Sequence, residues 1–282
     1  MKNYLASKFS VLLPIYLRAD PCELQHCLQS LVSQTLLPDE VVVVEDGPIT
    51  HELDTVLIEY SKKLNLVRHR CDKHRGLGPA LQDGLLKCSF PLVARVDSDD
   101  TSVPERFQWQ IEHLESNPQI SIVGGVLCET LPSNSNQTNL FRLNRELPTD
   151  PDNLRQFAKY RNPLSHPTVM FRRCSVLAVG GYQDCPFFED YFLWVRMLIG
   201  NKLLSNLERV LVHTTADNNY FSRRTGLSYR QAEWLFAEKL LKLGFHSRLE
   251  NMFFRIFRIP LRFLSREVIG GLYSRLLRKR TA

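Results

Sequence analysis

The first hundred residues alternate between short runs rich in valine and leucine and segments in which apolar residues recur at helical spacing. This alternation predicts a parallel, doubly wound α/β sheet, because strands that are separated by helices usually pair in parallel. The carboxyl ends of such strands lie along one rim of the sheet, where open α/β proteins bind their ligands. The expected strands are 9–16, 40–47, 66–69 and 92–96, and the expected helices are 19–34, 53–64 and 79–87.

Carboxylates follow two of these strands directly. Asp97, Asp99 and Asp100 end one strand, and so many like charges repel unless a counter-ion is present. Carboxylate oxygens suit Mg²⁺ or Mn²⁺, which proteins hold together with the phosphates of a substrate. With Glu45 and Asp46 at the end of a second strand, this pattern predicts a nucleotide-and-metal pocket. An acidic turn that caps the helix beginning near residue 103 remains the alternative.

The rest of the chain predicts further strands and a largely helical end. A polar loop is expected at 131–139, and the chain is expected to be helical from residue 228 onward. The other expected elements are helices at 104–115, 152–160 and 175–179, strands at 120–126 and 210–213, a loop entering a strand at 162–172, and an apolar helix that opens within 187–194.

The cysteine pattern and the lengths of the apolar runs indicate where in the cell the protein is expected to work. Seven cysteines form neither a CxxC pair nor a zinc spacing, which is typical of reduced thiols in a cytosolic protein. The N-terminus has no apolar leader, and no run approaches the roughly 18 to 20 apolar residues of a spanning helix. We therefore expect a cytoplasmic protein, with peripheral binding to the inner face of the plasma membrane as described next.

Basic residues concentrate at the C-terminal end. Residues 246–282 hold nine Lys and Arg against two acids, whereas the whole chain has a formal net charge of +6. Arg255, Arg258, Arg262 and Arg266 recur every three or four residues among large apolar side chains, which predicts a basic amphipathic helix on an anionic membrane. A helix that packs on the body or dimerises is the alternative. No nucleic-acid-binding fold accompanies the segment, so we expect no nucleic-acid partner.

Seven motifs in a fixed order resemble the family 2 glycosyltransferases of GT-A fold, in particular the bacterial branch that builds O-antigen, capsule and exopolysaccharide. The resemblance runs from about residue 9 to 229, and implies a GT-A domain over 8–229 with a mixed sheet flanked by helices. Residues 230–282 would then form a basic amphipathic helical segment. The motifs are SVLLPIY, VVVVEDGP, HRGLGPAL, RVDSDD followed by PERF, NPLSHPTVMFRR, GGY and FFEDYFLW.

The resemblance implies a role for particular residues. Asp190, together with Glu189, matches the general base, although both acids also suit the first turn of a helix. Asp97 and Asp99 match the DxD pair that holds Mg²⁺ or Mn²⁺, with Asp99 favoured as the direct ligand. His213 is a third candidate ligand, and a structural role is its alternative. The implied donor-binding residues are Pro14, Tyr16, Glu45, Asp46, Arg75, Asp97 and His166, of which His166 has a plain hydrogen-bonding role as its alternative.

The implied reaction is inverting transfer of one hexosyl or N-acetylhexosaminyl group from a nucleoside-diphosphate sugar, with UDP favoured. The acceptor is expected to be a hydroxyl of a glycan, carried on a polyprenyl diphosphate. No QxxRW motif follows Asp190, so we expect a single addition rather than polymerisation. A nucleotidyltransferase is disfavoured because residues 14–18 contain no glycine. A catalytically silent scaffold that binds nucleotide sugar or glycan remains open.

Overall fold

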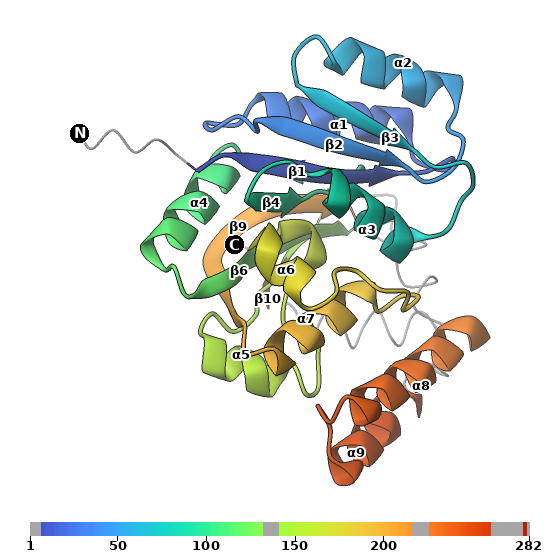
Figure 1. Cartoon of the computed structure of the whole chain (residues 1–282), viewed down its shortest axis with the longest axis vertical. Coiled ribbons are helices and arrows are strands. Elements are labelled where there is room, and N and C mark those ends of the chain that lie inside the picture. Colours follow the sequence, from blue (N-terminus) through green and yellow to red (C-terminus); the bar gives the residue numbers. More distant parts are fainter. Residues whose placement is uncertain (1–6, 132–140, 216–225, 261–278, 281–282) are drawn as a thin grey trace.

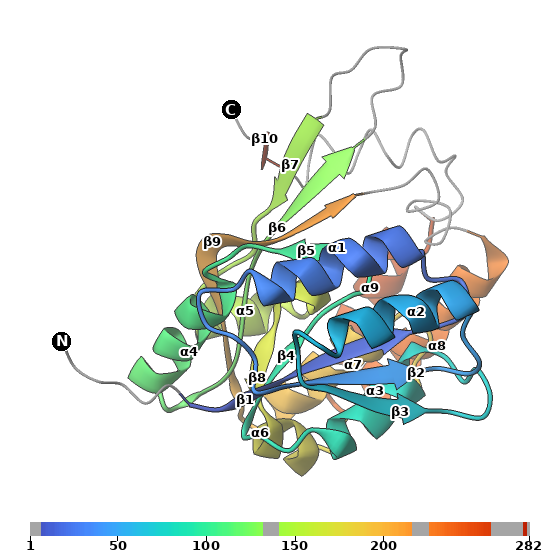
Figure 2. The ribbon, with the colours of Figure 1, turned by 90° about the horizontal axis from the view of Figure 1, so that it is seen from above.

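The computed structural model describes residues 7–131, 141–215, 226–260 and 279–280. Its described strands form one mixed sheet in the order β10-β7-β6-β8-β4-β1-β2-β3, with β9 paired to β5 and β6. Helices cover both faces of this sheet (Figures 1 and 2). The predicted fold class, a mixed α/β sheet flanked by helices, is confirmed.

The first part of the chain follows the predicted alternation closely. Strands β1, β2, β3 and β4 are all parallel, in the spatial order β4-β1-β2-β3. The elements are β1 (Phe9–Ile15), α1 (Pro21–Val32), β2 (Glu40–Glu45), α2 (His51–Tyr60), β3 (Leu66–Arg70), α3 (Leu77–Lys87) and β4 (Leu92–Arg95).

Alternating side chains of β1 build two separate cores, one on each face of the sheet. Phe9, Val11 and Leu13 pack with α1 and α2, while Leu12 packs with α3 and with helices from later in the chain. Successive strand residues point to opposite faces, so a strand that is buried on both sides must be apolar throughout. This double burial explains the unbroken apolar runs and sets the strand ends on one rim.

The second part of the chain completes the sheet with antiparallel and long-range pairs. β4 pairs antiparallel with β8, β8 with β6, and β6 with β7, whereas β6 and β9 run parallel. The strand expected at 210–213 is the inner part of the longer β9, and β5 and β7 were not predicted. The elements are β5 (Asp100–Ser102), α4 (Arg106–Ser116), β6 (Ile120–Leu131), β7 (Phe141–Arg145), α5 (Pro151–Phe157), η1 (His166–Thr168), β8 (Met170–Arg172), α6 (Arg173–Ala178), α7 (Glu189–Ile199) and β9 (Leu203–Thr215).

Two helices follow β9, α8 (Leu227–Lys242) and α9 (Arg248–Arg258), and they lie at the end of the molecule opposite α2 (Figure 1). The expectation of helix throughout this region is wrong at β10 (Lys279–Arg280), which pairs antiparallel with β7. Phe236 and Leu240 of α8 belong to the same core as α7, and α8 crosses the expected domain boundary at 229, so that division stays a prediction.

Parts of two predicted segments, the polar loop 131–139 and the basic tail, lie outside the described residues at 132–140 and 261–278. None of the helices in the described part of the chain is long and apolar enough to cross a membrane.

Candidate active site on the carboxyl rim of the sheet

Three carboxylates gather where β4 ends. One oxygen from each of Asp97, Asp99 and Asp100 lies within 4.8 Å of the others. Asp100 is buried, Asp97 is partly buried and Asp99 is exposed, so the cluster opens to solvent on one side. Burial raises the pKa of Asp100 well above its usual value, and the charges of Asp97 and Asp99 raise this pKa further. A group of carboxylates that repel one another is a donor set that fits Mg²⁺ or Mn²⁺.

Two buried arginines stand behind this cluster and partly offset its charge. Arg95, the last residue of β4, forms an ion pair with Asp97, and its Nε has no hydrogen-bond partner. Arg106 of α4 is fully buried and donates to the carbonyl of Arg95 at 2.7 Å and to Ser102 at 3.0 Å. Burial lowers the pKa of Arg106 to about 9, although the charge of Asp100 opposes that shift. The arginines thus fix the loop that presents the carboxylates.

Asp46 anchors the glycine-containing loop that precedes α3. Its carboxylate accepts hydrogen bonds from the backbone N–H groups of Arg75 at 2.7 Å and Gly76 at 2.9 Å. His74 Nδ1 lies 2.8 Å from the same carboxylate, and the His74 ring stacks on Tyr16 at 5.9 Å between centroids. Tyr16 and Asp46, predicted separately, therefore lie close together at the ends of β1 and β2, linked by His74. Arg75 contributes its backbone N–H there, while its guanidinium pairs with Asp83 of α3. Tyr16 offers an exposed aromatic face there.

The other residues predicted near the donor have clear structural partners. Glu45 is buried and forms ion pairs with Arg68 at 2.6 Å and Arg70 at 3.4 Å. Pro14 lies within β1 and pairs with Val44 of β2. The carboxylate of Glu45 is therefore neutralised by two arginines of the neighbouring strand β3. A contact of Glu45 or Pro14 with the donor stays a prediction.

Asp190 and Glu189 begin helix α7, and each is partly buried. Asn162 Nδ2 donates to Asp190 Oδ2 at 2.6 Å, and the backbone N–H of Tyr191 donates to Asp190 Oδ1. Burial raises the pKa of Asp190, while the bonds from Asn162 and Tyr191 oppose the rise. Burial and the charge of Asp190 raise the pKa of Glu189 to about 7. A carboxylate with a raised pKa suits proton acceptance near neutral pH.

A buried cluster of rings joins the two acidic regions. His166 Nε2 lies 3.0 Å from the hydroxyl of Tyr182, and the His166 ring also meets Trp194 edge-on at 5.9 Å. Burial lowers the pKa of His166 well below its usual value, and the positive charge of Arg95 lowers it further. Burial raises the pKa of Tyr182, as do the charges of Asp190, Glu189 and Asp97. A neutral imidazole and a neutral phenol therefore line the interior between both carboxylate groups.

A glycine turn sets the position of Tyr182. Gly181 has a φ of +61°, and a Cβ at this position would meet the side chain of Gln82 at 2.0 Å. Gln82 Oε1 accepts the backbone N–H of Tyr182 at 2.7 Å. The GGY motif thus brings the ring into the site because only glycine allows both this φ and this close approach.

His213, the third candidate metal ligand, is not one of the three residues that form the acidic cluster, and a role for it as a ligand stays a prediction. It lies on β9 opposite Thr101, whereas the side chain of its neighbour Thr214 hydrogen-bonds Asp100. Successive residues of a strand point to opposite faces, so Thr214 rather than His213 faces the cluster. The third member of the cluster is the carboxylate of Asp100.

Several residues of the site were not singled out from the sequence. Asn162 and Tyr182 fall within the motifs NPLSHP and GGY, and Arg95 begins RVDSDD, so the motifs were the available signal. What the motifs do not show is which side chain each residue meets. His74, in the loop 73–78, is a fourth residue of the site that was not singled out from the sequence.

Solved structures share this fold. The chain superimposes on S. aureus TarS 1–349 in complex with UDP-GlcNAc with a TM-score of 0.60 and 20% identity, covering 95% of this chain and 76% of that one. It superimposes on the mannosyltransferase PcManGT from Pyrobaculum calidifontis with a TM-score of 0.65 and 13% identity, covering 97% and 76%. The fold is therefore the GT-A fold of sugar-nucleotide transferases.

Relatives in sequence indicate the class of enzyme that this chain resembles. An uncharacterized glycosyltransferase of Haemophilus influenzae is 36% identical over 96% of this chain and all of its own length. The amylovoran biosynthesis glycosyltransferase AmsE of Erwinia amylovora is 34% identical, over 95% of this chain and 98% of its own. A UDP-Gal:alpha-D-GlcNAc-diphosphoundecaprenol beta-1,3-galactosyltransferase of Escherichia coli is 31% identical, over 96% and 97%.

The family model "Glycosyl transferase family 2" matches residues 10–180. The chain belongs to glycosyl transferase family 2, and is a glycosyltransferase related to enzymes of bacterial surface polysaccharide synthesis.

Proposed function

We propose that this chain transfers one hexosyl or N-acetylhexosaminyl group from a UDP-sugar to a hydroxyl of a lipid-linked glycan, with inversion at the anomeric carbon. The observation that carries the proposal is the cluster of Asp97, Asp99 and Asp100 on the rim of a GT-A sheet. UDP is favoured because the Escherichia coli relative is named for UDP-Gal and the TarS structure contains UDP-GlcNAc.

In this proposal Tyr16 stacks on the base of the donor, and Asp46 and Arg75 contact the base or phosphates. Asp99 and Asp97 are the proposed ligands of Mg²⁺ or Mn²⁺. When it is bound, the divalent cation stabilises the negative charge that develops on the leaving diphosphate. His166 is buried and neutral, and we propose that its ring lines the donor site on the side that faces the acceptor.

Asp190 is the proposed general base. Its carboxylate would accept the proton of the acceptor hydroxyl while that oxygen attacks the anomeric carbon and the bond to the diphosphate breaks. A single displacement of this kind inverts the anomeric configuration. The bond from Asn162 at 2.6 Å supports this role, because it holds one carboxylate oxygen in a fixed orientation.

The proposed acceptor is a glycan on a polyprenyl diphosphate. This acceptor class is supported by the printed name of the Escherichia coli relative, which includes diphosphoundecaprenol. A lipid carrier would bring the reaction to the membrane surface, so we also propose that the protein works on the cytoplasmic side, attached peripherally.

Helix α9 is the proposed membrane-docking element. Leu249, Met252, Phe253, Ile256 and Phe257 recur at helical spacing and are all exposed, up to 68% for Phe257. The opposite side of α9 is buried through Asn251 and Phe254. The exposed apolar face thus points away from the body, whereas Arg255 and Arg258 of the same helix contact Trp234 and Glu233 of α8. The apolar face favours a bilayer as its occupant, and the preference for an anionic bilayer rests on the other basic residues of 246–282.

Calorimetric titration of UDP into the purified full chain, with and without Mn²⁺, tests the donor assignment. We expect Mn²⁺-dependent binding in the wild type and its loss in Asp99→Ala. Asp152→Ala, which changes an exposed acid on α5, should bind as the wild type does. Absence of binding in the wild type with Mn²⁺ would contradict a UDP donor. Binding without sugar transfer to any lipid-linked acceptor would favour the scaffold alternative.

Vesicle flotation tests the docking face separately. We expect the wild type to float with vesicles of phosphatidylcholine and phosphatidylglycerol, and Phe253→Ser/Phe257→Ser to remain in solution. The control Ile58→Ser/Leu86→Ser changes two apolar residues of similar exposure on α2 and α3 and should float. Equal flotation of both double variants would contradict docking through α9, and concentration-dependent dimers of the wild type alone would assign the face to a second copy.

A further inference from the structure

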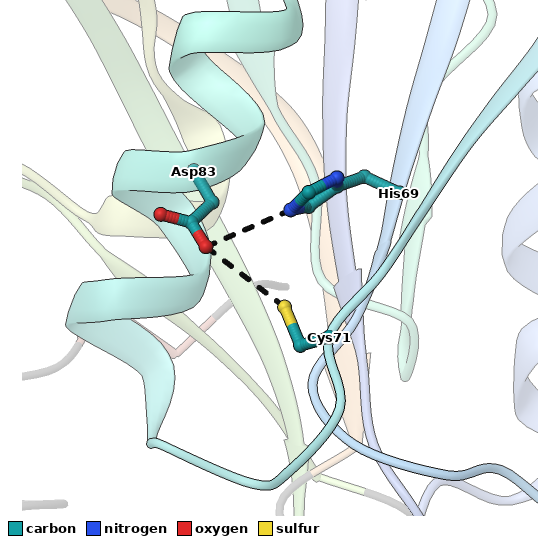
Figure 3. A group of neighbouring side chains, drawn as sticks. All are labelled: His69, Cys71 and Asp83. Carbon is teal, nitrogen blue, oxygen red and sulfur yellow. Dashed lines mark hydrogen bonds and ion pairs between the residues drawn. The ribbon is translucent and has the colours of Figure 1, made fainter.

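A second group of metal-ligating side chains lies away from the acidic rim cluster, between edge strand β3 and helix α3. His69 and Cys71 are two residues apart, so both point to the face of the sheet that α3 covers. Asp83 reaches toward them from α3 (Figure 3). The ligand atoms of all three lie within 4.8 Å of one another.

The separations approach those of a tetrahedral site. His69 Nε2 lies 3.6 Å from Asp83 Oδ2, and Cys71 Sγ lies 3.9 Å from the same oxygen. Two ligand atoms bound to one tetrahedral Zn²⁺ are roughly 3.3–3.6 Å apart, given its bond lengths of about 2.0–2.3 Å. Each of the three side chains is only partly buried, so an ion has access from solvent. Small rotations of these side chains would therefore close the ligand set.

Arg75 occupies the position of a counter-ion in this group. Its guanidinium forms an ion pair with Asp83 and lies 3.5 Å from Cys71 Sγ. A positive group beside a carboxylate and a thiol opposes the entry of a second cation. A metal ion would have to displace this guanidinium, so Arg75 and the metal compete for the same two ligands.

We propose that His69, Cys71 and Asp83 form a Zn²⁺-class transition-metal site, with Arg75 as its internal competitor. Nitrogen, sulfur and oxygen ligands together suit Zn²⁺ better than Mg²⁺ or Mn²⁺, and three ligands leave a fourth position for water. The site adjoins the donor site proposed above and shares Arg75 with it, so displacement of Arg75 would change the charge available to a donor.

Cobalt titration of the purified full chain, without nucleotide, provides the test. Co²⁺ bound by a thiolate gives a sulfur-to-metal charge-transfer absorption, and Zn²⁺ should abolish it by replacement. We expect one thiolate-bound Co²⁺ per chain in the wild type, and loss of the thiolate absorption in Cys71→Ser and His69→Gln. Arg75→Gln should bind Co²⁺ more tightly than the wild type, because the competing guanidinium is gone.

Two controls separate this site from other metal binding. Cys22→Ser removes an exposed cysteine on α1 and should leave the absorption unchanged. Asp99→Ala disrupts the rim cluster and should also leave it unchanged, so failure of the donor proposal would not affect this result. Absence of the thiolate absorption in the wild type, or its persistence in Cys71→Ser, would overturn the proposal. Circular dichroism of each variant checks that the fold is retained.

Discussion

The two acidic regions of the site differ in what surrounds their carboxylates. Asp97, Asp99 and Asp100 face one another, and two buried arginines lie behind them. Glu189 and Asp190 begin a buried helix, where the partners of Asp190 are a neutral amide and a backbone N–H. The first arrangement concentrates negative charge and suits a cation. Burial raises a carboxyl pKa in both regions, that of Asp100 in the first and those of Glu189 and Asp190 in the second. In the second region the carboxylate of Asp190 is held by neutral donors, and this arrangement suits proton transfer.

This contrast teaches that a run of acids in a sequence does not by itself define a role. Both regions contain adjacent carboxylates after an apolar stretch or before an apolar helix. The surrounding residues decide whether the negative charge is shared by a cation or held ready to accept a proton. The following variants test whether the two regions act separately.

The largest expected effect comes from Asp190→Asn. The amide cannot accept a proton, so we expect kcat to fall by about 10² to 10⁴-fold, the usual contribution of a general base. Metal-dependent UDP binding, measured by calorimetry, should be unchanged because the rim cluster is intact. Loss of UDP binding in this variant would show that the two acidic regions are not independent. Unchanged turnover would remove Asp190 from the role of base.

A smaller effect is expected from Arg95→Met. Arg95 pairs with Asp97 from the buried side, so its loss should leave that carboxylate poorly oriented. Partners that orient metal ligands are typically worth about 10 to 100-fold in metal affinity. Mn²⁺ titration followed by calorimetry should show this weakening, with a thermal unfolding curve as a check on folding. The control variant Arg209→Met, which changes an exposed arginine, should bind Mn²⁺ as the wild type does. Unchanged Mn²⁺ affinity in Arg95→Met would show that Arg95 does not orient the metal ligands.

The smallest effect is a shift of the pH profile in Asn162→Ala. The bond from Asn162 favours the ionised form of Asp190, so its removal should raise the pKa of Asp190 further. Because the base must be ionised, activity should then fall at a higher pH than in the wild type as the solution is acidified. At alkaline pH the two proteins should differ little. Asn153→Ala on α5 is the matched control, and a profile identical to the wild type would contradict the assignment.

Local pattern was enough to predict the first half of the fold. Strands β1 to β4 are short apolar runs between helices of regular spacing, and each forms where its own residues predict it. β5 and β7 were missed because β5 has only three residues and β7 depends on pairing with β6. The full length of β9 was missed for the same reason, since it pairs with β6 through a register that shifts along its length.

The same distinction between local pattern and long-range packing applies to the residues of the site. Asp97 and Asp99 were singled out because they lie two residues apart, directly after a predicted strand. The partnership of Asn162 with Asp190, 28 residues apart, depends on how two segments pack. The pairing of Glu45 with Arg68 likewise arises between neighbouring strands. His213 illustrates the limit, because its position on the last predicted strand gave no information about which face of the sheet its side chain occupies.

The segment after α5 touches both the docking helix and the base. Lys159 forms an ion pair with Glu250 of α9, and its carbonyl lies 3.0 Å from His246 Nε2. The carbonyl of Tyr160 accepts from Arg258 at 2.9 Å, and two residues later Asn162 holds Asp190. The contact path from α9 to Asp190, the proposed base, is therefore only a few residues long. In the proposed membrane-docked state this short path would set the angle at which the body meets the lipid surface. A lipid-linked acceptor would then reach Asp190 by diffusing in the plane of the bilayer, while the nucleotide sugar would arrive from solution.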